Sequence, residues 1–544
     1  MFFSTWILFL LILFNISLAD HYKGGTLSWK PTDPYSLTSP VEIIITERHS
    51  WTLTRYQCNN NIINTLGTYN DTQNATTATI ICISSAAACL SSFFQTINSP
   101  LYCTDFSTVL QISSGTYYTK QNLALNSIID IASRGASWAS ETLTNDWSLV
   151  SHIDLTPISG KINTSPVTGS LPIFHLYYYV TSVIQILAAD WDYDQIVRCR
   201  WSYQYSLDEC GSTCFDLPNA QLNPVDCAIT WKPVLRSEDI ANGLTESTYV
   251  VAITAEDFVN ASSITPLSSV PHQILVHVSY KPVNACSTKP TVSGFPRRNL
   301  ACYCKINGTP GSTYGYTFQG RIYCLNDSVV EFISTSPFRV QKGNIYQQSN
   351  YTWAIPVIWT LPSSQTGLQP FCIAAVDNNG QTSDQYCVMI AVGANNPSII
   401  TPRFVQSTAS PLGTVMATQS RFSIQIQTTL PLRRTKLAGT YIRIYQMGYG
   451  SPAYTIDCKY SPDVYFLNKT IVFFIQNPSW TLGATYYISM TDGVATADQY
   501  CGVEAGGISN SVYWRFTIWN SAVSSTTTPS TTTSTATTHT VTTR

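Results

Sequence analysis

The chain has 544 residues, which is too many for one hydrophobic core and suggests roughly three to five domains. Charged residues make up only 11% of it, and the formal net charge is −2. So little charge argues against nucleic acid and anionic membranes as partners, and the abundance of tyrosine, threonine and valine favours strands over helices.

The N-terminus has the features of a secretory signal. An apolar run from Trp6 to Phe14 precedes Ser17 and Ala19, which form the small-x-small pattern that signal peptidase recognises. We therefore predict that residues 1–19 are removed. The alternative is a retained anchor, for which the apolar run is short, and no later stretch of the sequence predicts a transmembrane segment.

The cysteines and the glycosylation sequons agree with secretion. The 16 cysteines are an even number, as expected for disulfides formed in an oxidising compartment. Eight Asn-x-Ser/Thr sequons follow the signal and predict N-glycans on exposed loops. Their asparagines are Asn70, Asn74, Asn163, Asn260, Asn307, Asn326, Asn350 and Asn468.

The first predicted domain, residues 20–168, opens with a short strand. This strand contains Gly24-Gly25, where another segment can approach the backbone closely. Strand signals with turns between them follow, beginning with Val41–Thr46. A stretch rich in Pro, Gly and Ser from Pro157 to Pro172 marks the domain's end.

The second domain contains the densest charged segment of the chain, which reads Asp-Trp-Asp-Tyr-Asp-Gln-Ile-Val-Arg-Cys-Arg-Trp and starts at Asp190. In an extended strand the carboxylates of Asp190, Asp192 and Asp194 would point the same way. Carboxylate oxygens in an extracellular loop suit calcium, the one cofactor that the sequence suggests. The alternative is a solvated hairpin turn whose acids face water or pair with the two arginines of the segment.

Four cysteines in and after this segment lie close together in the sequence. Cys199 stands between the two arginines, and Cys210, Cys214 and Cys227 follow within the same domain. We predict that these four are disulfide partners, although their connectivity stays open.

The third domain contains a well-defined hairpin. Cys372 and Cys387 are equidistant from Asn379-Gly380, and an Asn-Gly pair is the preferred type I′ turn. A two-residue loop there places the two cysteines directly opposite each other and predicts a cross-strand disulfide.

The fourth domain has the clearest strand alternation, because Phe422, Ile424 and Ile426 are separated by polar residues. Its two cysteines, Cys458 and Cys501, are predicted to pair. The Ser/Thr-rich stretch after it lacks core-forming residues and predicts a disordered, O-glycosylated stalk. Without a hydrophobic tail, we expect a freely secreted protein or the start of a longer chain.

The predicted fold class is therefore all-β, with about four tandem disulfide-containing β-sandwiches of the immunoglobulin-like type. The predicted boundaries are a signal peptide at 1–19, β-sandwiches at 20–168, 169–281, 282–394 and 395–522, and a mucin-like stalk at 523–544.

The charged segment, together with Glu209-Cys-Gly-Ser-Thr-Cys214, resembles a pattern found in large secreted or cell-surface proteins of invertebrates. These are mostly uncharacterised strings of β-sandwich modules. Ala255–Phe258 and Leu267–Pro271 fit the later part of the pattern, and the fourth domain looks like an immunoglobulin-like module. The resemblance implies fold and location, and it implies no activity.

The sequence favours binding over catalysis. It contains no His-Glu-x-x-His pattern, Gly-x-Ser-x-Gly elbow, P-loop or dinucleotide fingerprint. We predict a non-enzymatic extracellular glycoprotein for binding or adhesion, with a protein or glycan partner, that is secreted or held at the cell surface. The alternatives are a structural matrix or coat component and, last, a secreted hydrolase with a dispersed site.

Overall fold

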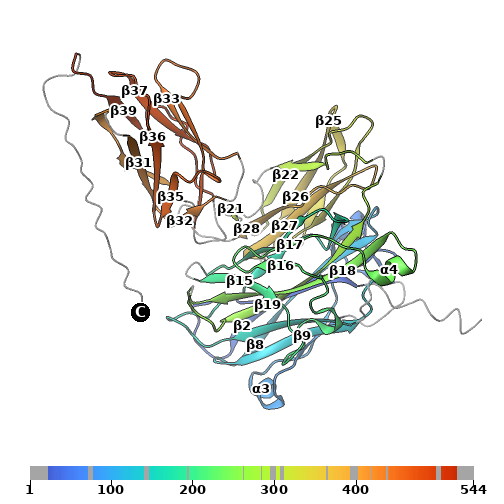
Figure 1. Ribbon diagram of the computed structural model, residues 1–544. Helices are drawn as coiled ribbons and strands as arrows, with labels where there is room; N and C mark the ends of the chain where they lie inside the picture. Colours follow the sequence, from blue (N-terminus) through green and yellow to red (C-terminus); the bar gives the residue numbers. More distant parts are fainter. Residues whose placement is uncertain are drawn as a thin grey trace, which may run out of the picture. The chain divides into compact units, whose positions relative to one another are not determined.

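The computed structural model is almost entirely β-structure, and its described residues form two compact units, one up to residue 392 and one from residue 402 on (Figure 1). The predicted signal peptide, Asn74, Asp194, Asn307, Cys501 and the Ser/Thr-rich tail lie outside the described residues. No helix in the described part is long and apolar enough to cross a membrane. The structure describes residues 22–71, 78–139, 146–192, 195–260, 262–282, 285–294, 302–306, 311–362, 365–392, 402–417, 420–435, 439–497 and 504–522.

The strands up to residue 280 form one large sheet and several small ones. The large sheet contains β1 (Tyr22–Pro31), β2 (Val41–Thr52), β5 (Ala78–Cys82), β6 (Ile97–Ser99), β7 (Tyr102–Ser107), β8 (Ile112–Leu123), β9 (Ile128–Ala136), β10 (Asp146–Asp154), β12 (Ile173–Tyr177), β15 (Ile196–Trp201), β18 (Glu246–Phe258) and β19 (Ser268–Ser279). The small sheets contain β3 (Tyr56–Gln57), β4 (Asn70–Asp71), β11 (Val167–Gly169), β13 (Ser182–Gln185), β14 (Leu187–Ala189), β16 (Gln221–Asn223) and β17 (Ala228–Trp231). Short helical turns occupy α2 (Asn60–Asn64), α3 (Ala86–Ser91), η1 (Gly211–Thr213) and α4 (Ser237–Ala241).

Strand β19 is the centre of the large sheet. One of its edges pairs with β18 along its whole length, and the other pairs in turn with β10, β1 and the parallel strand β12. The predicted boundary at residue 168 therefore does not separate two sheets. Gly24 permits this pairing, because a Cβ atom there would lie 2.2 Å from the Gln273 carbonyl oxygen.

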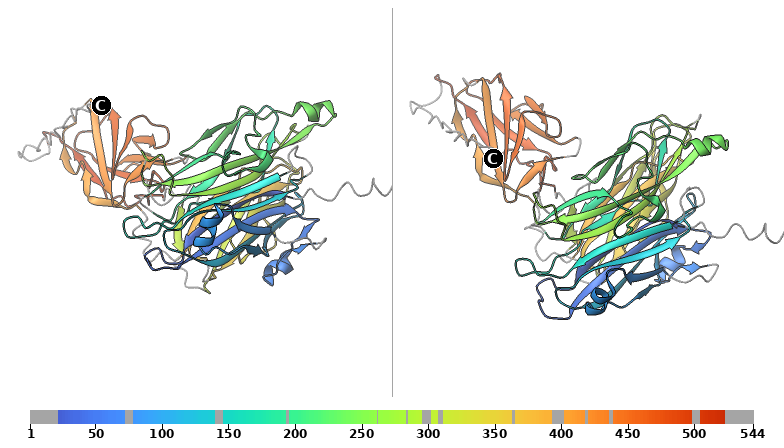
Figure 2. Two further views of the ribbon diagram at one scale, coloured as in Figure 1. Left: turned by 90° about the horizontal axis from the view of Figure 1, so that it is seen from below. Right: turned by 60° about the horizontal axis from the view of Figure 1, so that its bottom comes forward.

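Two hydrophobic cores lie on the two faces of the β18–β19 pair, which explains why the sequence reads as two sandwiches. Val250 and Leu275 point into the first core, whereas Val251 and Val276 point into the second. Figure 2 shows these central strands in green, running beside the blue and cyan strands of the N-terminal part. The first core also joins side chains of β1 and β2 to those of β9 and β10, so the large sheet folds over on itself.

The third sandwich belongs to the same compact unit. Its two sheets contain β20 (Thr291–Gly294), β22 (Thr313–Arg321), β24 (Val340–Lys342), β25 (Tyr346–Ser349) and β26 (Thr352–Thr360), and β21 (Cys302–Ile306), β23 (Val329–Thr335), β27 (Gly367–Asp377) and β28 (Tyr386–Val392). Cys372 lies opposite Cys387 and forms a disulfide with it, in the register that the sequence predicts. The connection is longer than a two-residue turn, because the Asp377 carboxylate accepts hydrogen bonds from the backbone of Asn379 and Gln381.

The second unit is a sandwich of two main sheets with one core. It contains β29 (Phe404–Ser410), β30 (Gly413–Val415), β31 (Arg421–Thr428), β32 (Leu432–Arg434), β33 (Tyr441–Gln446), β34 (Tyr454–Asp457), β35 (Val464–Leu467), β36 (Thr470–Gln476), β37 (Thr485–Met490), β38 (Ala495–Ala497) and β39 (Arg515–Ile518). Phe422, Ile424 and Ile426 lie in its core, as their alternation predicts. Cys458 is buried, and its disulfide with Cys501 stays a prediction because Cys501 lies outside the described residues.

The prediction of an all-β fold built from disulfide-containing β-sandwiches is confirmed. The four cysteines near the charged segment form two disulfides, Cys199–Cys227 and Cys210–Cys214. The other pairs in the described part are Cys58–Cys103, Cys82–Cys89, Cys286–Cys324 and Cys372–Cys387.

The N-glycan expected at Asn163 does not fit the structure. The side chain is only 2% exposed, and its amide nitrogen, which would carry the sugar, donates to Asp257 at 2.7 Å and Ser268 at 3.3 Å. The sequon alone does not indicate this burial, because Asp257 and Ser268 lie about a hundred residues further along the chain. Of the other described sequons, four have exposed asparagines, namely Asn260, Asn326, Asn350 and Asn468.

We therefore expect secreted protein to carry N-glycans at the four exposed asparagines and none at Asn163. Peptide mass spectrometry after enzymatic glycan release in ¹⁸O-labelled water measures the occupancy of each site. Because all sites come from one sample, the exposed asparagines serve as internal controls. A substantially occupied Asn163 would contradict the buried cluster in which the structure places it.

An exposed aromatic loop as the candidate functional site

The charged segment makes contacts inside the protein, and neither of its two described aspartates faces water. Asp190 follows β14, and Asp192 lies two residues further on, before β15. Both are only 6% exposed. The interpretation as a solvated hairpin turn is therefore wrong for these two residues, while Asp194 lies outside the described part.

Asp192 fastens the segment to the loop before β11. One of its carboxylate oxygens pairs with Lys161 Nζ at 3.0 Å, and the other accepts the Thr164 backbone N–H at 2.7 Å. Asp190 accepts the backbone N–H of Asp192 at 2.9 Å. With its amide nitrogen turned toward the acids, Gln195 donates to Asp190 at 3.0 Å and Asp257 at 3.1 Å.

Asp190 and Asp257 lie within hydrogen-bond distance of each other and share one environment. Burial raises the pKa of Asp190 well above its ordinary value, and the charges of Asp257 and Asp192 raise it further. Burial also raises the pKa of Asp257 to about 6, against hydrogen bonds from Asn163 and Ser268 that lower it. The simplest account is one proton held between the two carboxyl groups.

We predict that the contribution of the Asp190–Asp257 pair to stability falls as the pH rises from about 4 to 6, whereas the buried, neutral His175 and His272 contribute in the opposite direction. A carboxyl group whose pKa is raised by folding holds more protons in the folded chain, so stability is greatest below the unfolded pKa and is lost through the folded one. Asp190→Asn should remove this contribution, so the free energy of unfolding of the wild type minus that of the variant should decrease between pH 4 and 6. At pH 7 the variant should unfold with a free energy equal to the wild type or up to roughly 2 kcal/mol higher. Urea unfolding across the pH series measures both. A difference that does not change with pH would exclude the shared proton.

Calcium at Asp190, Asp192 and Asp194 stays a prediction. Carboxylate and amide oxygens are suitable calcium ligands, but Asp192 already pairs with Lys161. Thermal unfolding with calcium and with chelator tests this interpretation. A higher melting temperature in calcium would assign a metal to the cluster, and equal temperatures favour the shared proton.

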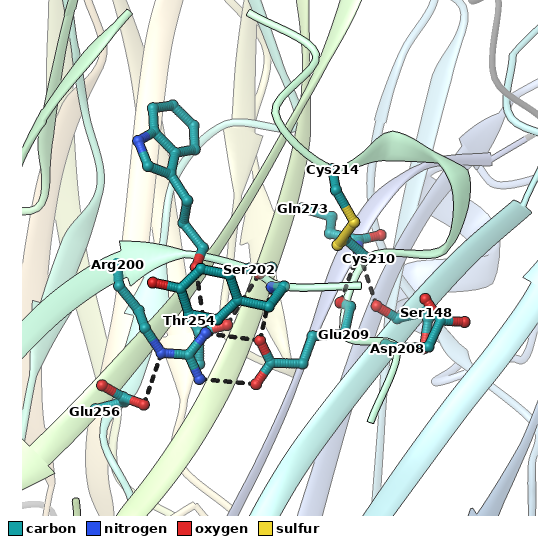
Figure 3. Close-up of polar contacts among 12 residues, drawn as sticks. Ser148, Arg200, Ser202, Asp208, Glu209, Cys210, Cys214, Thr254, Glu256 and Gln273 are labelled. Atoms are coloured by element: carbon teal, nitrogen blue, oxygen red, sulfur yellow. Dashed lines mark hydrogen bonds and ion pairs between the residues drawn. A yellow bond between two sulfur atoms is a disulfide. The ribbon is translucent and has the colours of Figure 1, made fainter. Parts of the chain in front are cut away.

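The second half of the charged segment holds a loop in place (Figure 3). Arg200 of β15 makes two hydrogen bonds to Glu209, at 2.6 and 2.8 Å, and its Nε donates to Glu256 of β18 at 2.8 Å. Glu209 is only 6% exposed and also accepts the Tyr203 backbone N–H at 2.9 Å. Such paired, planar contacts fix the geometry of both partners. The disulfide between Cys210 and Cys214 closes the chain directly after Glu209.

Further contacts fasten the same loop to the large sheet. Ser148 of β10 donates to the Asp208 carbonyl at 2.5 Å, and Gln273 of β19 donates to the Glu209 carbonyl at 3.4 Å. Gly211 lies so close to β10 that a Cβ atom there would be 2.5 Å from the Asp146 carbonyl oxygen. Neighbouring strands therefore hold the loop from several sides.

This braced loop presents aromatic side chains to solvent. Tyr203, Tyr205 and Phe215 are 50%, 89% and 56% exposed, and the Tyr203 and Phe215 ring centroids lie 6.2 Å apart. We call residues 203–215 the aromatic loop. Three of its non-glycine residues, Ser206, Asp208 and Phe215, have positive φ, a strained conformation that persists only where surrounding contacts impose it.

Sequence reasoning missed this loop as a site. The expectations drawn from the sequence concern the carboxylates and cysteines of this region and not its aromatic residues. A signal was present, since two tyrosines at alternate positions precede a tight Cys-x-x-x-Cys pair. Only the structure shows that the rings are exposed.

The described histidines are buried or partly buried, and most of them bond to other side chains of the protein. His49 pairs with Glu47 at 2.7 Å with both side chains fully buried, and His152 pairs with Asp130 at 2.8 Å. His272 is bonded to Ser170 at 2.8 Å. Burial lowers the pKa of both His175 and His272 to about 3, so each is neutral at ordinary pH.

Fold and site thus define an all-β protein of serial, disulfide-containing β-sandwich modules, with a braced aromatic loop on one of them. No protein-family model matches the sequence, and no curated protein matches it. Among solved structures, it is similar to the D00-D0 domain of intimin, with 12% identity and a TM-score of 0.14 over 40% of this chain and 98% of that one.

Two further solved structures are similar at the same level. Fibronectin(III)-like modules of CbhA from Clostridium thermocellum show 9% identity and a TM-score of 0.20, covering 43% of this chain and 97% of theirs. An endo-fucoidan hydrolase of glycoside hydrolase family 107 shows 14% identity and a TM-score of 0.13, covering 53% and 37%. Similarities this low carry no inference about function.

Proposed function

We propose that the protein is a non-enzymatic, extracellular binding or adhesion protein whose partner, a protein or a glycan, contacts the aromatic loop. The observation that carries this proposal is the exposure of Tyr203, Tyr205 and Phe215 on a rigid support. Exposed aromatic residues dominate the energy of protein interfaces, and holding them rigid reduces the entropy lost on binding.

Other features support the extracellular setting and the absence of catalysis. Disulfides throughout the first unit suit an oxidising compartment. Exposed sequons on several loops suit a glycoprotein. His49 and His272 are buried, which keeps their side chains away from any substrate.

The test is to measure binding of the purified, labelled protein to arrays of glycans and of extracellular protein domains. The double variant Tyr205→Ser/Phe215→Ser removes two exposed rings and leaves Arg200 and Glu209 intact. Tyr346→Ser, which removes a 48% exposed ring from the third sandwich, is the matched control. We expect the wild type and the control to bind the same partner and the double variant to bind at least tenfold more weakly.

The outcomes separate the alternatives. Unchanged binding by the double variant would move the binding surface away from the aromatic loop. Self-assembly of the purified protein in sedimentation velocity, without binding on either array, would favour the structural matrix or coat component.

A further inference from the structure

A cavity of about 150 Å³ with a mixed polar and apolar lining lies on the face of the large sheet opposite its first core. Alternation along β1 directs Leu27 and Trp29 into that core and leaves Thr26, Ser28 and Lys30 on the other face. In β2, Arg48 lies opposite Thr26, so polar side chains of neighbouring strands form rows across this face.

The third sandwich covers this face, and both belong to the same compact unit. Lys30 Nζ donates to the carbonyl and hydroxyl oxygens of Thr366, which precedes β27, and Arg48 Nη2 donates to the Ser336 carbonyl at 2.8 Å. Gln365–Pro370 therefore line the far side of the cavity. Thr32 and Thr366 are lining residues that are exposed, so the cavity opens to solvent.

The charges on the cavity wall are unbalanced. Lys30 and Arg48 both line it, and none of its described lining residues is an aspartate or glutamate. Arg48 Nη1 is buried and has no hydrogen-bond partner among the described residues. Asp105, an acid whose charge acts on Arg48, accepts hydrogen bonds from Ser334 and Ser336. A buried donor without an acceptor is costly, so Arg48 Nη1 can take a further acceptor.

The hydroxyl groups on the wall add further donors. Thr26, Thr46 and Thr116 line the cavity on β1, β2 and β8, and Thr26 shares a hydrogen bond of 3.0 Å with Thr168. A cavity of this volume holds a group of about benzene's size. It therefore admits a carboxylate or sulfate group and leaves outside most of any larger molecule that carries the group.

We propose that this cavity, the Lys30–Arg48 pocket, binds a small oxyanion, either a sulfate or a carboxylate. Arg48 Nη1 would donate to the oxyanion, Lys30 would supply the second charge, and the threonine hydroxyls would complete the shell. Burial lowers the pKa of Lys30 to about 8, which is consistent with a lysine that lacks an acidic partner. The pocket is separate from the aromatic loop, so the two proposals can fail independently.

Isothermal titration calorimetry of the full secreted protein with sodium sulfate and with sodium acetate, at constant ionic strength in chloride, tests the proposal. We expect saturable binding of at least one of the two anions to the wild type. Lys30→Gln and Arg48→Gln should each weaken that binding at least tenfold. Lys120→Gln, which changes an exposed lysine of β8 outside the pocket, should bind as the wild type does.

Absence of saturable binding of both anions to the wild type would overturn the proposal, and so would wild-type affinity in Lys30→Gln. If Arg48→Gln does not fold, as judged by circular dichroism, Lys30→Gln alone decides. A sulfated or carboxylated disaccharide that binds more tightly than the free anion would identify a glycan as the source of the oxyanion. Equal affinity would identify a free anion.

Discussion

The Gly24→Ala variant is expected to unfold with a free energy roughly 3–5 kcal/mol below that of the wild type. Gly24 has a φ of +119°, a conformation that side-chain-bearing residues rarely adopt. An added methyl group would also lie 2.2 Å from the Gln273 carbonyl oxygen, where the backbone of β19 cannot yield. The unfavourable φ and the steric overlap both disturb the pairing of β1 with β19. The loss of stability should therefore exceed that of an ordinary surface substitution.

Urea unfolding of Gly24→Ala and of Gly315→Ala makes the comparison. Gly315 lies in β22 with an ordinary φ, and no atom lies within 4 Å of the position that a Cβ atom would take. Its replacement should therefore be neutral or slightly stabilising. Equal effects at the two glycines would show that β1 does not approach β19 as the structure has it.

Glu209→Ala is expected to lower the free energy of unfolding by about 3 kcal/mol and to weaken partner binding as well. The change leaves Arg200 with Glu256 alone and frees the Tyr203 backbone N–H. Removing one member of a largely buried ion pair is costly because the remaining charge stays poorly solvated. The aromatic loop would also lose the hydrogen bond that holds Tyr203, its first residue.

Chemical unfolding and array binding measure the two effects, with exposed Glu238→Ala as the control, expected within about 0.5 kcal/mol of the wild type. A double-mutant cycle with Arg200→Met isolates the pair from other consequences. A stable Glu209→Ala variant with unchanged binding would show that neither stability nor binding depends on the brace.

Local patterns in the sequence predicted local structure well. The alternation of Phe422, Ile424 and Ile426 predicted a strand with one buried face, because strand periodicity is a property of neighbouring residues. The symmetric spacing of Cys372 and Cys387 predicted their register for the same reason. The actual connection between them is longer than predicted, since Asp377 caps it with its own side chain.

Features that depend on distant segments were missed. Two separate sandwiches were expected where β1 returns to pair with β19, a strand from the other end of the unit. Asp190 and Asp192 were expected to face a solvated turn or calcium, but their partners Lys161 and Asp257 come from other loops and strands. The exposure of Tyr205 depends on the same non-local packing. Residue spacing alone does not encode such contacts.

The position of β19 also decides how the protein can form as it is synthesised. Strand β1 ends at Pro31, yet its partner β19 begins only at Ser268. At about 5–20 residues per second, the N-terminal strand emerges tens of seconds before the strand that completes its sheet. Until then β1 has one unpaired edge, which in other proteins is a site of aggregation. The nascent chain should therefore depend on chaperones until residue 279 has been made, and shorter N-terminal fragments should not fold alone.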